Sequence, residues 1–209
     1  MAPTVDELVV GDEPAAWAAA GFAVDGDGTC RVGPVRILLA GPGGGRHLRS
    51  WSLRDLPAGA PAAVDGIPTA ASARRPPEPA AHPNGAVAVD HVVVRSPDVD
   101  RTAAAVTAAA GVEVRRVRHA GGDPPVRQVF FRLGEVVLEL IGPEEPDRSD
   151  PRPARLWGLA HTVADLDATA ALLGDRLGPV RDAVQPGRRI ATLRHRELGL
   201  SVPTAFMSR

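Results

Sequence analysis

Residues 31–42, RVGPVRILLAGP, align without a gap on residues 132–143, RLGEVVLELIGP. Arginine, glycine, valine, leucine, glycine and proline recur at the same places, and most other positions stay apolar. Each block predicts a strand, a tight turn centred on glycine, a second strand and a Gly-Pro stop. Because the same supersecondary unit occurs twice, the fold is predicted to consist of copies of one module.

A strand and a helix precede each of these blocks. The strands are predicted over 5–10 and 89–94, and the helices over 14–20 and 98–110. Proline or an acid opens each helix and a glycine follows its end, which are the usual signals at helix termini. Each module therefore reads as a strand, a helix and about three further strands.

A third copy follows near the C-terminus. Its first strand is predicted over 158–163, its helix over 165–173, and its closing hairpin over 188–194 and 198–202. Glycine at position 174, directly behind the helix, is the expected stop.

Residues 49–53, RSWSL, resemble residues 155–159, RLWGL, and indicate a fragment of a further module without a helix. The sequence thus predicts an α+β fold of tandem βαβββ modules, two complete at the C-terminal end and one decayed N-terminal copy. We expect an incomplete module over 1–56, a linker over 57–86 and a two-module domain over 87–209. Because the linker is rich in proline and alanine, it should run extended, without a ladder or a long helix.

Charge and composition exclude several classes of partner. The chain has 24 basic residues, all arginine, and 25 acids, so its net charge of −1 attracts neither nucleic acid nor an acidic membrane. No apolar run approaches the ~20 residues that span a bilayer. Cys30 is the only cysteine, which excludes an intrachain disulfide and favours a reducing compartment. With no basic flank at the start, the N-terminus does not resemble a signal peptide, and we expect a cytoplasmic protein. Arginine at every basic position, with much alanine, glycine and proline, is typical of GC-rich bacteria. Because the N-terminal module cannot close a cavity alone, we expect it to pack on the C-terminal domain or on a second copy in a homodimer.

The modules resemble a known superfamily. Residues 89–94, VDHVVV, followed by PDVD at 97–100, and ADLD at 164–167 of the next module, are similar to the vicinal oxygen chelate superfamily. It includes glyoxalase I, extradiol dioxygenases, methylmalonyl-CoA epimerase and the bleomycin and fosfomycin resistance proteins. The resemblance covers 87–207 as a two-module domain with a cavity between its modules, and 4–56 more weakly.

The resemblance implies a metal site. In metal-dependent members, the first and last strands of each module each supply one ligand, usually His, Glu or Gln. His91 occupies the first-strand position and Glu139 the last-strand position. An imidazole and a carboxylate suit a divalent Zn, Fe, Mn or Ni ion, which would act as Lewis acid and template. Glu139 is also the expected catalytic group, because it could transfer a proton. As purely structural residues, His91 would be a strand histidine and Glu139 the ion-pair partner of an arginine.

The third module departs from this ligand pattern. If the helix starts Asp98 and Asp165 are matched, Gly158 stands opposite His91, whereas matching histidines puts His161 there. We prefer the helix-start alignment, because a shift by three residues would invert the face of the whole strand. His161 should then point at the following helix, neutral and hydrogen-bonded through one ring nitrogen.

The remaining ligand positions are also poor. The position opposite Glu139 falls near Ser201, and the N-terminal module has Glu7 and Leu38 at its two positions. Two ligands of four survive, or three if the histidine of the third module turns inward, which would favour a dioxygenase-like iron site.

Functions of different classes remain open. The first is a metal-assisted lyase, isomerase or dioxygenase acting on a substrate with neighbouring oxygens. The alternative is a non-catalytic protein of the resistance type, which binds a drug or metabolite with an incomplete metal site. A third is an interaction scaffold whose N-terminal module only packs.

Overall fold

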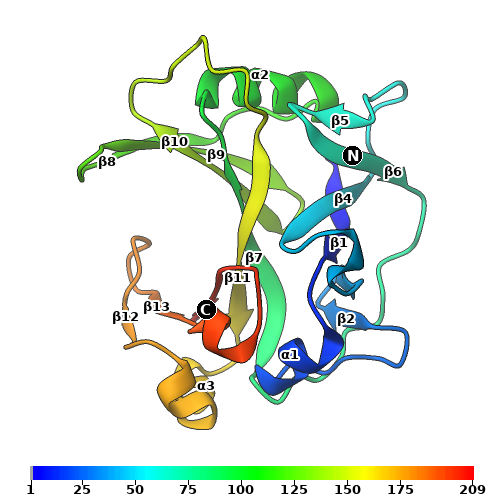
Figure 1. Ribbon diagram of the computed structural model, residues 1–209, viewed down its shortest axis with the longest axis vertical. Coiled ribbons are helices and arrows are strands. Elements are labelled where there is room, and N and C mark those ends of the chain that lie inside the picture. The colour runs from blue at the N-terminus through cyan, green and yellow to red at the C-terminus, as the bar shows by residue number, and fades with distance from the viewer. Residues whose placement is uncertain (1) are drawn as a thin grey trace. The chain divides into compact units, whose positions relative to one another are not determined.

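The computed structural model describes residues 2–209 (Figure 1). A six-stranded sheet has the order β2-β3-β1-β4-β6-β5. Its strands are β1 (Thr4–Val10), β2 (Thr29–Val32), β3 (Val35–Leu39), β4 (Leu48–Arg54), β5 (Ala63–Val64) and β6 (Ile67–Ser72). The helix of this part of the chain is α1 (Pro14–Ala19).

An eight-stranded sheet has the order β12-β13-β14-β11-β7-β10-β9-β8. Its strands are β7 (Ala86–Arg95), β8 (Arg116–Ala120), β9 (Val126–Leu133), β10 (Val136–Pro143), β11 (Arg155–Val163), β12 (Arg181–Asp182), β13 (Arg189–Thr192) and β14 (Thr204–Met207). The helices here are α2 (Val99–Ala110) and α3 (Leu166–Leu173). No helix of the described part of the chain is long and apolar enough to cross a membrane.

The eight-stranded sheet contains the two expected C-terminal modules. Both β7-α2-β8-β9-β10 and β11-α3-β12-β13-β14 run strand, helix and three strands along the chain. In the sheet, each module reads first, last, third and second strand outward from β7 or β11. The α+β fold of tandem modules is therefore confirmed, while the descent of the N-terminal strands from a decayed copy stays a prediction.

The repeated blocks form equivalent hairpins. Gly33 joins β2 to β3 with φ 58°, and Gly134 joins β9 to β10 with φ 61°. Both lie in the left-handed region that side chains disfavour, which explains why glycine stands at the centre of each block.

The expectation of an extended linker is wrong for part of that segment. β5 and β6 lie within it, and β6 pairs in parallel with β4. Asp65 and Gly66, with φ 45° and 83°, form the two-residue turn between β5 and β6, and both positive values suit a primed hairpin turn. The described residues 57–85 contain no helix, as expected.

The expected closing strand over 198–202 is also wrong, because the closing strand is β14. β14 pairs in parallel with β11, Leu159 opposite Thr204. In the predicted strand segment, Leu200 and Val202 are buried, but the Ser201 amide donates to the buried carboxylate of Asp12 instead of to a strand. Alternating apolar residues there fill the core from a loop.

Contacts divide the chain into two compact units. The first contains the N-terminal segment to Asp6, Ser50–Arg74 and His91–Trp157; the second contains Glu7–Arg49, Arg75–Asp90 and Gly158–Arg209. These units cut across the expected boundaries at 56 and 87, which stay a prediction.

In the first unit, α2 packs on β9, β10 and β5. Asp98 caps its first turn by accepting from the amides of Asp100 and Arg101, each at 3.1 Å. Gly111 ends it with φ 65°. Both termini agree with the sequence signals, because caps are local interactions.

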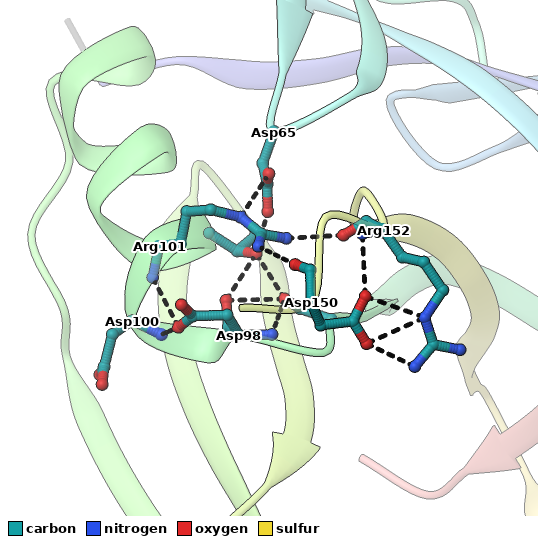
Figure 2. A network of polar contacts seen from close by, with 8 residues as sticks. Asp65, Asp98, Asp100, Arg101, Asp150 and Arg152 are labelled. Atoms are coloured by element: carbon teal, nitrogen blue, oxygen red, sulfur yellow. Dashed lines mark hydrogen bonds and ion pairs between the residues drawn. The ribbon is translucent and has the colours of Figure 1, made fainter. Parts of the chain in front are cut away.

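Arg101 ties three segments of the first unit together (Figure 2). Its Nε donates to Asp65 in the β5–β6 turn at 2.9 Å. Its two terminal nitrogens donate to the backbone carbonyls of Asp150 and Arg152, at 3.0 and 2.7 Å. The expected linker and the loop before β11 are thereby fixed to the start of α2.

Candidate functional site

The strand register places His91 and Glu139 on one face of the first unit. β7 and β10 are parallel, with His91 opposite Val137 and Val93 opposite Glu139. Paired residues point to the same side, and residues two apart along a strand do so as well. His91 and Glu139 are thus diagonal neighbours, about 8 Å apart for the strand spacing and rise of a sheet.

β8 and β9 extend the same face. Gln128 stands opposite Ile141 of β10, and Arg118 stands opposite Gln128. We call the face of β7, β10, β9 and β8 that bears His91, Glu139, Gln128 and Arg118 the site face.

The two faces of these strands differ in burial. On the face opposite the site face, Val92, Val94, Leu138 and Leu140 are all fully buried, as is Phe131 at 1% exposure. On the site face, Glu139, Gln128 and Arg118 are half-exposed, whereas His91 is buried at 6%. One face therefore supplies the core beneath α2, and the other supplies polar groups within reach of a ligand.

A chain of hydrogen bonds runs across the site face. Arg118 donates from Nη1 to the amide oxygen of Gln128 at 2.8 Å. Gln128 donates from Nε2 to Oε1 of Glu139 at 2.5 Å. The amide of Gln128 is thus oriented at both ends, and it holds the Glu139 carboxylate beside His91.

Burial raises the pKa of the Glu139 carboxyl above its ordinary value, because the charged form loses hydration. The charge of His91 and the hydrogen bond from Gln128 lower this pKa, and Arg118 does so more weakly. Glu139 is therefore a carboxylate whose ionisation depends on its neighbours.

Known proteins resemble this chain in sequence and in fold. Residues 90–192 match the model of the glyoxalase/bleomycin resistance protein/dioxygenase superfamily. Over these residues the chain belongs to that superfamily. The resemblance to vicinal oxygen chelate proteins seen in the sequence is confirmed.

Solved structures resemble this chain in fold at low sequence identity. A triple mutant of 4-hydroxymandelate synthase from Streptomyces coelicolor is 17% identical, with a TM-score of 0.67, over 99% of this chain and 91% of its own. Methylmalonyl-CoA epimerase from Mycobacterium tuberculosis is 20% identical, with a TM-score of 0.48, over 59% of this chain and 89% of its own. No curated protein matches the chain significantly.

The donor set does not fit the metal site implied by the superfamily. Asp98 and Asp165 are both helix caps, so the alignment at the helix starts holds and Gly158 corresponds to His91. The same alignment, followed through the strand register, makes Ala205 the counterpart of Glu139. Ser201, the residue expected there, lies outside β14.

Glycine and alanine side chains cannot bind a metal, so the module that begins with β11 supplies no ligand at these two positions. Within residues 2–209, no group of three or more His, Cys, Asp or Glu side chains could hold an ion. A closed site normally takes four ligands and a catalytic site at least three. The N-terminal strands repeat the register, with Glu7 opposite Arg36 and Val9 opposite Leu38, so Leu38 stands where Glu139 does.

His161 lies in the core of the second unit. In the parallel register it stands opposite Phe206, and its ring is edge-on to Trp17 and Phe22 at 6.3 and 5.0 Å. It is 0% exposed, and neither ring nitrogen has a hydrogen-bond partner among the described residues. Burial lowers its pKa to about 3. The expected neutral form agrees with this environment, but the expected hydrogen bond is wrong, and the ring contacts are aromatic.

Sequence reasoning missed Gln128 and Arg118. Both lie on strands that the repeat predicts, and alternation along β9 would place Gln128 on the side of Phe130. Only the pairing of β8 with β9 brings Arg118 beside Gln128, which no local pattern indicates.

Proposed function

We propose that this protein binds a small molecule on the site face and does so without a resident metal ion. One observation carries the proposal. His91 and Glu139 share one face of the sheet, and hydrogen bonds from Gln128 and Arg118 hold Glu139 there, while the counterparts Gly158 and Ala205 carry no donor. Of the functions open from the sequence, the non-catalytic binding protein with an incomplete metal site agrees best with this asymmetry.

The character of the face supports a ligand site. Small-molecule sites combine apolar lining with a few oriented polar groups. Here Val93, Val137 and Phe130 supply apolar surface around Glu139, and Gln128 fixes the orientation of its carboxylate. A rigid sheet holds these groups more exactly than a loop would.

Ligand screening by amide chemical shifts of the full-length protein tests the proposal. Bound molecules should perturb amides of β7, β9 and β10 around His91 and Glu139, and Glu139→Leu should weaken their binding. The matched control is Glu135→Leu, since Glu135 lies in the exposed turn between β9 and β10. Perturbation confined to other strands would contradict the proposed site.

Metal analysis of the purified protein tests the second half of the proposal. The expected result is less than one ion per chain after purification without chelator. A stoichiometric ion that is lost in both His91→Ala and Glu139→Gln would overturn it.

Proton transfer by Glu139 is the second candidate function, and its position on the half-open face beside His91 favours it. A ligand found by the screen would be incubated with the protein in D₂O. Deuterium incorporation that depends on Glu139, and persists in Glu135→Gln, would establish an enzyme. An equal rate in wild type and Glu139→Gln would leave only binding.

A further inference from the structure

The charges on the site face are strongly unbalanced. Besides Arg118, register places Arg116 opposite Phe130, Arg132 opposite Val137 and Arg95 opposite Ile141. Four arginines therefore share the face with a single acid, Glu139. The whole chain has 24 basic and 25 acidic residues, so this excess is local.

Most of these arginines lack a carboxylate partner. Among residues 2–209, no acid lies within ion-pair distance of Arg95, Arg116 or Arg118. Arg132 approaches the exposed Glu135 at 3.7 Å, a distance and exposure at which the pair contributes little. The positive charge of the face is thus available to a ligand.

Arg116 and Arg118 form the stronger part of this charge. They are two residues apart on β8, so they point to the same side of the strand. Gln128 accepts from one terminal nitrogen of Arg118 and thereby orients its guanidinium. A guanidinium held in this way loses less conformational freedom when it binds a carboxylate or phosphate through paired hydrogen bonds.

Apolar surface adjoins these two arginines. Phe130 stands directly opposite Arg116 and also opposite Glu139, between the basic strand and the centre of the face. On the other side of the face, the Arg95 guanidinium lies 5.2 Å from the ring centre of Trp157. Charge at one end and apolar surface beside it suit a ligand with the same two parts.

We infer that the ligand is an organic anion whose carboxylate or phosphate pairs with Arg118 and Arg116 and whose apolar body covers Phe130. This inference rests on the proposed function, since it names the chemical class that the site face takes. Carboxylate and phosphate share the recognising chemistry, and the experiment separates them.

The test uses three probes that share a phenyl ring, applied to the full-length protein: benzoate, phenyl phosphate and benzamide, the neutral analogue of benzoate. Amide chemical shifts report both the affinity and the place of binding. Benzoate or phenyl phosphate should bind at the site face at least about tenfold more tightly than benzamide, because charge-assisted hydrogen bonds are stronger than those between neutral groups.

Variants assign the anion to its arginines. Arg118→Gln should raise the Kd of benzoate about tenfold. Arg118→Lys should recover part of the lost affinity, because lysine keeps the charge without the planar fork. Arg148→Gln is the matched control, since it removes the same charge from an exposed loop of the same unit. Its Kd should stay within about twofold of wild type.

The outcomes separate the inference from the proposed function. Equal binding of benzoate and benzamide at the site face would overturn the inference and keep the function. Absence of shifts on the site face with all three probes would overturn the inference, whereas the proposed function would be overturned by a ligand screen that perturbs only other strands. Tighter binding of phenyl phosphate than of benzoate supports the inference and identifies a phosphoryl group.

Discussion

The modules that begin with β7 and β11 share their architecture but differ in the polarity of their site positions. His91 and Glu139 in the first correspond to Gly158 and Ala205 in the second. Each module keeps its capped helix and its strand order, so the backbone does not need polar side chains at these positions. The difference teaches that the fold is symmetric while its chemistry belongs to one module.

At one core position the polar residue is instead in the module that begins with β11. Val94 is fully buried in the first module, and its counterpart in the second is His161, which is also fully buried. Neither ring nitrogen of His161 has a partner within the described residues, and such burial is costly. The polar side chains therefore lie on the site face in the first of these modules, whereas in the second a histidine lies in an aromatic core.

Exchange of the core residue should have the largest effect. Val94→His places a larger, polar ring where apolar side chains pack, and we expect a loss of about 3 kcal/mol in unfolding free energy. Urea unfolding at pH 7 measures it. Val117→His, at a residue that is 47% exposed, is the control and should change stability by less than about 0.5 kcal/mol. An equal cost for both variants would mean that the core of the first module tolerates polarity as the second does.

The buried histidine of the second module should make the protein acid-sensitive. The pKa of His161 falls from 6.5 to about 3 on folding, so the neutral form is favoured in the folded state. The contribution of the neutral His161 to the unfolding free energy is fully present above pH 6.5. It is lost as the pH falls from 6.5 toward 3, by about 1.4 kcal/mol for each pH unit. His161→Leu should remove this dependence, measured by urea unfolding at pH 7, 5.5 and 4.5.

His119→Gln is the control for this prediction, because the His119 side chain is 65% exposed. It should leave the loss of stability in acid unchanged. The same slope in His161→Leu as in wild type would show that His161 is hydrated or partnered in solution.

The helix caps should show where the two modules are alike. Asp98 accepts from two amides at 3.1 Å, and Asp165 accepts from two at 2.9 and 3.1 Å. Asp98→Ala and Asp165→Ala should each lower the unfolding free energy by about 1 kcal/mol, more for the buried Asp98. Asp98→Asn keeps an acceptor and should restore most of the loss. A cap effect in only one module would break the structural correspondence on which the comparison rests.

The smallest expected effect is at Glu139. Its pKa is raised above 4.5, so the protonated carboxyl is favoured in the folded state, and this contribution is present below the unfolded pKa and lost as pH rises through the folded value. Glu139→Gln should therefore stabilise the protein at pH 7 by less than about 1 kcal/mol. The gain should vanish below about pH 4, where both forms are neutral. Thermal unfolding at both pH values measures it, and Glu135→Gln, in an exposed turn, should show no such change.

Local signals explain the correct part of the sequence analysis. Asp98, Asp165 and Gly111 act within one helical turn, and Gly33 and Gly134 act within one hairpin. Caps and primed turns need no distant partner, so their residues predict them directly. Alternation along β7 and β10 likewise predicts which residues of each strand lie on the same side as His91 or Glu139.

Distant pairing explains the errors. β6 contains a proline and small residues, yet it is a strand because its backbone pairs with β4. Residues 198–202 alternate like a strand, but the amide of Ser201 finds a carboxylate of Asp12 far along the chain. Strand formation depends on the partner edge as much as on propensity, and the sequence does not state the partner.

The sequence by itself determined the modules, their capped helices and the superfamily, because each depends on short-range patterns or on their order along the chain. Only the tertiary structure decided that Gln128 and Arg118 complete the polar chain of Glu139 and that Ala205, not Ser201, is its counterpart. It also decided that His161 is enclosed by aromatic rings without a hydrogen bond. These facts depend on the register between strands, and a register is set by the pairing of backbones and the filling of the core together.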